Sequence, residues 1–202
     1  MDVSGISPAP SPNGKRLTIV HAPTDRAIKG TDHIIASITA LSRHHDIELV
    51  LVENMPHAKA LQMYRNADLA IDQMRVGWYG TFSVEMMALG KPVVCYIRED
   101  DLGFIPLQMA SDLPVIRANP LTLTDVLTDI CTHRERLRDI GNRSRAFVER
   151  WHNPDKIAER MLHIYQNPSA SFWSNAVSDS ASARRPDKPM TTKTSYSSDH
   201  RL

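Results

Sequence analysis

Residues 67–97, ADLAIDQMRVGWYGTFSVEMMALGKPVVCYI, contain two short apolar runs separated by a glycine-containing loop and a helical stretch. The runs Ala67–Asp72 and Pro92–Ile97 have the length and the composition of buried strands. Between them, Phe82–Leu89 is typical of a helix, and Gly90 suits its C-terminal end. A strand, a helix and a second strand in this order predict a β-α-β unit with parallel strands.

The same alternation continues on both sides of this unit. Upstream, Leu17–Ala22 and Ile47–Val52 are further apolar runs, and a helical stretch follows each, the first with Thr31 as its N-cap. Downstream, a fifth strand is expected at Leu113–Arg117. Three helical patterns follow it, at Thr122–His133, Arg134–Trp151 and Pro154–Tyr165. We therefore expect an α/β domain, a Rossmann-like parallel sheet with helices on both faces.

The two ends of the chain differ from the middle in composition. Residues 1–15 are rich in proline, glycine and serine, as linkers are, and we expect them not to pack. Residues 168–202 contain many serines but one leucine and no isoleucine, which predicts a disordered tail in which Phe172 and Trp173 can dock locally. The folded domain is thus expected at residues 16–167, a length of about 150 residues that can bury one core.

The overall composition excludes several classes of protein. The 202 residues include 24 Lys and Arg against 23 Asp and Glu, so the net charge of +1 argues against a nucleic-acid-binding protein. The sequence contains neither a membrane-spanning apolar run nor a signal peptide. Two cysteines provide no disulfide framework and no Cys/His metal spacing, so we expect no metal and no cofactor. The glycine motifs of dinucleotide-binding and P-loop proteins are also missing.

Ligands of parallel sheets bind beyond the carboxyl ends of the strands, so the loop after the first strand is a candidate site. This loop reads HAPTDRAIKGTD and places Arg26, Lys29 and Gly30 just before a helix. Backbone N–H groups and the helix dipole attract an anion at such a position, and the two cations can pair with phosphate oxygens. The alternative interpretation is a solvated basic loop.

The loop after the third strand, DQMRVGWYGTFSVE, is the second candidate anion site. Gly80 permits close approach of a ligand to the backbone, and the N–H groups of Thr81, Phe82 and Ser83 follow at the start of a helix. Glu85 lies in the first helical turn. Its carboxylate either complements the helix dipole or accepts hydrogen bonds from ligand hydroxyls such as a ribose diol.

These motifs resemble a known family. The order HAP…R..KGT over residues 21–31 and the segment GWYGTFSVEMMALGKPVV over residues 77–94 are similar to the C-terminal domain of GT-B glycosyltransferases. The most similar group is family 4, the group 1 glycosyltransferases. The resemblance covers residues 3–166 and includes FVERWH at 147–152, which looks like the closing helices of that family. It implies a single GT-B half, the half that binds the nucleotide-diphosphate sugar donor.

The resemblance also implies roles for individual residues. Lys29 and Arg26 would hold the donor diphosphate as the catalytic cations, and Glu85 matches the second glutamate of the Glu-x7-Glu motif, which binds the ribose. Backbone donors would come from two glycine-containing segments, Gly30 and the turn Gly80–Ser83.

One position departs from the pattern of the family. The first glutamate of the motif, which contacts the donor sugar, falls at Gly77, and Asp72 and Gln73 are candidates to replace it. The nucleotide base would lie near the loop Glu53–His57.

The implied activity is retaining transfer of a glycosyl group from a nucleotide-diphosphate sugar, without a metal. The acceptor would bind to an N-terminal-type domain, which another chain would supply. The alternatives are a nucleotide-sugar-binding module without catalysis, a subunit of a split transferase, and a scaffold protein that senses a phosphorylated ligand. The expected location is the cytoplasm, with attachment to the inner membrane face as an option and no transmembrane segment.

Overall fold

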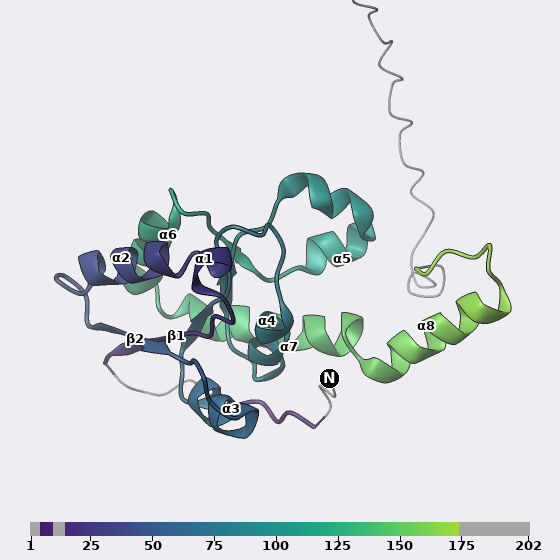
Figure 1. Cartoon of the computed structure of the whole chain (residues 1–202), viewed down its shortest axis with the longest axis horizontal. Helices are drawn as coiled ribbons and strands as arrows, with labels where there is room; N and C mark the ends of the chain where they lie inside the picture. Colours follow the sequence, from purple (N-terminus) through teal and green to yellow (C-terminus); the bar gives the residue numbers. More distant parts are fainter. Residues whose placement is uncertain (1–4, 10–14, 174–202) are drawn as a thin grey trace, which may run out of the picture.

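The computed structural model describes residues 5–9 and 15–173. Its centre is a five-stranded parallel sheet with the strand order β2-β1-β3-β4-β5 (Figure 1). The strands are β1 (Leu17–His21), β2 (Ile47–Leu51), β3 (Leu69–Ile71), β4 (Val93–Cys95) and β5 (Ile116–Arg117). The expected Rossmann-like α/β fold with a parallel sheet is confirmed.

The helices connect successive strands and then close the domain. They are α1 (Arg26–Lys29), α2 (Thr31–Leu41), α3 (His57–Arg65), α4 (Thr81–Ala88), the 3₁₀ helix η1 (Glu99–Phe104), α5 (Leu107–Asp112), α6 (Leu123–Thr132), α7 (Arg136–Trp151) and α8 (Pro154–Gln166). The sequence pattern did not predict α1, η1 and α5, because helices of four to six residues are too short to show a periodicity.

Alternate strand residues point to opposite faces of the sheet and build two hydrophobic cores. In β1, Ile19 joins one core, and the next residue, Val20, joins the other. The core around Ile19 is covered by α2 and α6, which lie side by side in Figure 1. The core around Val20 is covered by α3, α4, α5 and α7. Helices therefore cover both faces, as the continuous apolar strands require.

A glycine lets α7 pack directly on the turn that follows α4. A Cβ atom at Gly141 would lie 2.2 Å from the carbonyl oxygen of Gly90, so a larger residue does not fit. Gly90 itself has a φ of +73°, in the left-handed region that favours glycine at a helix end. This close contact holds α4, the helix that begins at the predicted site, against the longest helix of the domain.

The strand order defines where a ligand is expected. The connection after β1 leads through α2 to β2, whereas the connection after β3 leads through α4 to β4 on the other side. The strands before β3 are therefore added toward one edge of the sheet and those after it toward the other, and the strand order reverses between β1 and β3. In sheets of this order the crevice at the carboxyl ends of those two strands is the usual ligand site.

Two local expectations are corrected by the structure. Thr31 is not the N-cap of α2: Gly30, with a φ of +72°, holds that position, and Thr31 is the first helical residue. The expectation that the N-terminal lead does not pack is wrong for residues 5–9. Ile6 is buried, and the N–H of Ala9 donates to the carbonyl of Leu89 at 3.0 Å.

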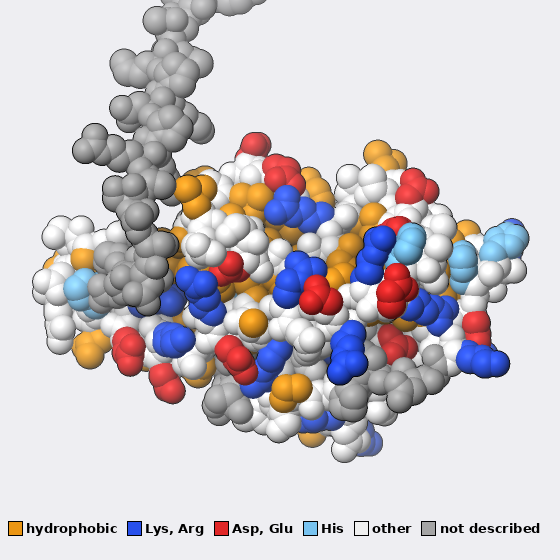
Figure 2. Space-filling model, turned by 180° about the vertical axis from the view of Figure 1, so that it is seen from behind, with side chains coloured by type: hydrophobic (Ala, Val, Ile, Leu, Met, Phe, Trp, Pro, Cys, Tyr) orange, Lys and Arg blue, Asp and Glu red, His pale blue; other side chains and the backbone are white. Residues whose placement is uncertain are grey.

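The predicted disordered tail lies outside the described residues from position 174 onward. Trp173 does dock, as expected, with its ring centroid 6.3 Å from that of Trp151. On the face drawn in Figure 2, basic and acidic side chains are mixed, with hydrophobic side chains between them, so no large patch of one charge covers that face.

Candidate functional site

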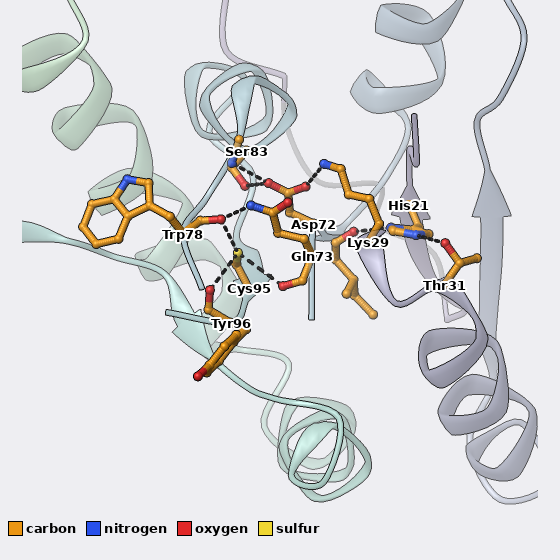
Figure 3. A network of polar contacts seen from close by, with 11 residues as sticks. His21, Lys29, Thr31, Asp72, Gln73, Trp78, Ser83, Cys95 and Tyr96 are labelled. Atoms are coloured by element: carbon orange, nitrogen blue, oxygen red, sulfur yellow. Dashed lines mark hydrogen bonds and ion pairs between the residues drawn. The ribbon is translucent and has the colours of Figure 1, made fainter. Parts of the chain in front are cut away.

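Asp72 is the centre of the polar network at the carboxyl end of β3 (Figure 3). Its side chain is fully buried. One carboxylate oxygen accepts hydrogen bonds from the N–H of Gly80 at 2.8 Å and from the hydroxyl of Ser83 at 2.6 Å. The other oxygen accepts from the ammonium group of Lys29. One carboxylate therefore connects the loop after β1 to the start of α4.

Lys29 lies at the carboxyl end of β1, and its ammonium group has a partner in Asp72. Its side chain is 12% exposed, and its Nζ atom would lie 3.7 Å from a Cβ atom on Gly80. An ammonium group has three donors, and the ion pair with Asp72 uses one of them. The Lys29 ammonium thus lies within van der Waals distance of the position that a Gly80 side chain would occupy, beside the first turn of α4.

The first turn of α4 has donors of its own. The N–H of Gly80 and the hydroxyl of Ser83 both donate to Asp72. The next N–H groups, those of Thr81, Phe82 and Ser83, have no acceptor within the helix, as at any helix start. Among the residues predicted to bind phosphate through the backbone, these three supply the N–H donors of the helix end.

Arg26 lies away from this centre. Its guanidinium forms a two-pronged contact with Glu53, in the loop after β2, and its Nε donates at 2.8 Å. Hydrogen bonds from Arg26 lower the pKa of Glu53. The Arg26 side chain is 53% exposed, so it is accessible from solvent at the rim of the same edge of the sheet.

Glu85 is buried in α4, and its carboxylate meets His57. Oε1 of Glu85 lies 2.7 Å from Nε2 of His57, the first residue of α3. The Glu85 side chain is 9% exposed, whereas that of His57 is 66% exposed. The contact brings the loop predicted to lie near the base next to the carboxylate predicted to bind the ribose.

His21, at the end of β1, has a structural role. Its Nδ1 donates to the carbonyl of Ile71 at 2.7 Å, and its Nε2 accepts from the Thr31 hydroxyl at 2.9 Å. This assignment follows because the carbonyl can only accept. Burial lowers the pKa of His21, so the ring is neutral near pH 7. The imidazole therefore joins β1, β3 and the start of α2 directly behind Lys29.

Gly77 adopts a backbone conformation that explains the missing glutamate. Its φ is +87°, and a Cβ atom there would lie 3.0 Å from the Cβ atom of Arg98. The carbonyl of Gly77 accepts from the N–H of Arg98 at 2.8 Å. The loop is thus folded onto the segment after β4, and a side chain at position 77 is strained and crowded.

Neither candidate replacement for that glutamate has a free side chain. Asp72 is committed to its three donors, and Gln73 is buried and donates its amide to the carbonyl of Trp78. The thiol of Cys95 packs beneath this loop and contacts the Gln73 carbonyl at 3.5 Å. Figure 3 shows these side chains gathered around the loop, where they support the backbone.

The structure brings together most of the predicted residues. Lys29, Gly80 and Ser83 meet at Asp72, Gly30 begins α2 behind them, and Phe82 is buried in the core. The site also includes Asp72 as its organising carboxylate, together with His21 and His57, which the pattern analysis left without a role. A polar residue that ends an apolar strand is the signal that could have identified Asp72 and His21.

Within residues 5–9 and 15–173, no group of three or more His, Cys, Asp or Glu side chains could hold a metal ion. No described helix has both the length and the apolar character needed to span a bilayer.

The fold is that of the C-terminal domain of GT-B glycosyltransferases, and solved structures with that fold are similar to it. Sucrose-phosphate synthase from Thermosynechococcus elongatus matches 83% of the chain with 15% identity and a TM-score of 0.61. The C-terminal domain of the group 1 glycosyl transferase LpcC from Francisella tularensis matches 76% with 15% identity and a TM-score of 0.53. TarM from S. aureus, in complex with UDP, α-GlcNAc-glycerol and fondaparinux, matches 78% with 12% identity and a TM-score of 0.57.

The matches cover different shares of the known proteins. The match spans 51% of the synthase and 37% of TarM, but 99% of the LpcC domain. The chain thus corresponds to one domain of the longer proteins. No family model matches the sequence, and no curated protein has a similar sequence.

Proposed function

We propose that the chain is the donor-binding half of a retaining glycosyltransferase and binds a nucleotide-diphosphate sugar at the carboxyl ends of β1 and β3. The observation that carries the proposal is the convergence of the Lys29 ammonium and the N-terminus of α4 on Asp72. A cation beside a helix start is a site for phosphate oxygens. The UDP in the TarM complex supports a nucleotide ligand for this fold.

In this proposal, the diphosphate, the ribose and the base of the donor each have their own binding groups. The diphosphate lies against Lys29 and the N–H groups of Thr81 and Phe82, and Arg26 approaches from the rim. The ribose hydroxyls donate to Glu85, whose pairing with His57 holds the carboxylate in place. The base then lies along the loop Glu53–His57, which ends at the same contact.

The proposed reaction uses the same groups. The bond between the sugar C1 and the β-phosphate oxygen breaks, and a bond forms between C1 and an acceptor hydroxyl oxygen, whose proton is released. The diphosphate leaves with the electron pair of the broken bond. Lys29 and the helix N-terminus stabilise its growing negative charge, which is electrostatic catalysis by groups already in position. The proposal needs no metal and no nucleophile from this chain.

The acceptor site belongs to a further domain in this proposal. The matched region is about half of the synthase, so the full reaction requires a second half, which an N-terminal-type domain on another chain can supply. We place the reaction in the cytoplasm, and attachment to the inner membrane face stays a prediction.

Isothermal titration with UDP-, GDP- and ADP-sugars tests the proposal. We expect the full chain to bind at least one of them, and Lys29→Met to weaken that binding at least tenfold. Lys59→Met is the matched control, because Lys59 is exposed on α3, and it should bind as the unmodified chain does. Failure of all three donors to bind, or equal binding by both variants, would contradict the proposal.

A further inference from the structure

Tyr79 is a buried tyrosine in the loop that leads into α4. It is 8% exposed, and its ring lies edge-on to those of Phe147 and His152, with centroid distances of 6.2 and 5.7 Å. Its hydroxyl oxygen lies 3.0 Å from Nε2 of His152, so the two side chains share a hydrogen bond in either imidazole tautomer. Burial lowers the pKa of His152 to about 4, and the ring is therefore neutral near pH 7.

His152 lies at the corner between α7 and α8. Its backbone N–H donates to the carbonyl of Val148 at 2.8 Å and ends α7. The next residue, Asn153, is the N-cap of α8, and its side-chain oxygen accepts from the N–H groups of Asp155 and Lys156. In Figure 1, α8 extends from this corner away from the sheet. Because His152 is hydrogen-bonded to Tyr79, the position of the Tyr79 side chain depends on the position of this corner.

The loop around Tyr79 is also held from the side of the sheet. The N–H of Gly80 donates to Asp72, and the carbonyl of Trp78 accepts from the side chain of Gln73. Adjacent Cα atoms are 3.8 Å apart along the chain, so a displacement of Tyr79 moves Gly80 with it. Gly80 in turn sets the first turn of α4, whose N–H of Val84 donates to the Gly80 carbonyl at 3.3 Å.

We propose that His152 is a positioning residue for the donor site: its contact with Tyr79 fixes the loop from which the anion-binding end of α4 begins. Two side chains 73 positions apart thereby link the α7–α8 corner to the site. His152 acts through Tyr79 and does not contact the donor. The inference rests on the proposed function for the identity of the ligand, whereas the link between corner and loop does not depend on it.

Amide hydrogen exchange of the full chain without ligand tests the link. In Tyr79→Phe and His152→Ala we expect the N–H groups of Gly80 and Val84, which are both hydrogen-bonded in the structure, to exchange about three- to tenfold faster, the effect of losing one hydrogen bond. His152→Gln should restore slow exchange, since glutamine offers both a donor and an acceptor. Tyr165→Phe is the control, because Tyr165 is 74% exposed on α8. A folded Tyr79→Phe with unchanged exchange, or exchange that rises equally in β1, would overturn the link.

Titration of the same variants with the nucleotide sugar that the unmodified chain binds best tests the role in the donor site. We expect Tyr79→Phe and His152→Ala to lower affinity about three- to tenfold, and His152→Gln to bind like the unmodified chain. Faster exchange with unchanged affinity would overturn the positioning role. If the unmodified chain binds no nucleotide sugar, the proposed function is wrong, and the exchange experiment alone decides whether the corner and the loop are linked.

Discussion

Lys29 and Asp72, which are 43 positions apart in the sequence, form an ion pair that joins the loop after β1 to the end of β3. Asp72 is fully buried, and the side chain of Lys29 is 12% exposed. The pair serves the fold, because it fixes two loops to each other. In the proposed function it also serves the ligand, because it holds the ammonium beside the start of α4.

The two roles of Lys29 can be separated by a pair of substitutions. Lys29→Met leaves a buried carboxylate without its cation, and we expect a loss of about 3 kcal/mol in the free energy of unfolding. Asp72→Asn should cost a similar amount, and the double variant less than the sum of the two. Donor binding should stay weak in the double variant, because the cation is still missing. Urea unfolding and calorimetric titration measure the two effects.

Asp100→Asn is the control for this experiment, because Asp100 is exposed on η1. We expect its stability to change by less than about 0.5 kcal/mol. Additive losses in the double variant would show that the ion pair contributes no coupling. Recovery of donor binding in the double variant would show that Lys29 acts only through the fold.

Replacing Gly77 should weaken the fold and should not restore a sugar contact. The φ of +87° and the 3.0 Å approach to Arg98 make any side chain unfavourable, and we expect Gly77→Ala to lower stability by about 1–3 kcal/mol. Gly77→Glu should lower it at least as much, without a gain in donor affinity. Gly103→Ala is the control, because a Cβ atom there meets nothing within 4 Å. A stable Gly77→Glu variant with tighter donor binding contradicts this account.

In Gly141→Ala, a gain in helix propensity competes with a loss from overpacking. Alanine in a helix is favoured over glycine by about 1 kcal/mol. A Cβ atom at this position would lie 2.2 Å from the Gly90 carbonyl oxygen, however, so α7 must move away from the turn after α4. Overpacking of this kind costs about 1–3 kcal/mol, and we therefore expect net destabilisation, measured as a lower urea midpoint. An unchanged or raised midpoint would show that the two segments separate without loss.

Buried histidines predict a loss of stability at acidic pH. Burial lowers the pKa of both His21 and His152, to about 4 for His152, whereas an unfolded histidine titrates near 6.5. The unfolded chain therefore binds more protons below about pH 6.5, and the free energy of unfolding falls as the pH decreases toward 5. His152→Gln should flatten this slope by up to about 1.4 kcal/mol per pH unit. Urea unfolding at pH 7.0, 6.0 and 5.0 measures it; an equal slope in both proteins would count against a buried neutral ring.

Much of the architecture could be inferred from local patterns. The apolar runs around Ile19 and Val94 predict strands, and the helical repeat of Ile34 and Ile38 predicts α2, because each depends on residues close in sequence. The short helices, such as α1, could not be predicted in this way. The single turn of α1 exists because the Asp25 side chain accepts from the N–H of Ile28, and because the Lys29 carbonyl accepts from Met74.

The candidate site shows the same division. Lys29, Gly80 and Glu85 could be nominated from the sequence, because a cation, a glycine and a carboxylate near helix starts have a local chemical meaning. The residues that pair with them in the structure could not be predicted from the sequence. That Asp72 receives Lys29, and that Glu85 faces His57, follows from which strands are neighbours. The conformation of Gly77 is likewise set by its contact with Arg98, which lies beyond the next strand.

The amino-acid pattern alone was sufficient for the class of fold, and it was sufficient to nominate the edge of the sheet and most of the residues of the candidate site. This is so because hydrophobic periodicity and helix-start chemistry act over a few neighbouring residues. The three-dimensional arrangement was needed for the ion pair at Asp72, the closure of position 77 to a side chain, and the link from Tyr79 to His152. These contacts join segments far apart in the chain, and they depend on strand order and helix packing, which no local pattern specifies.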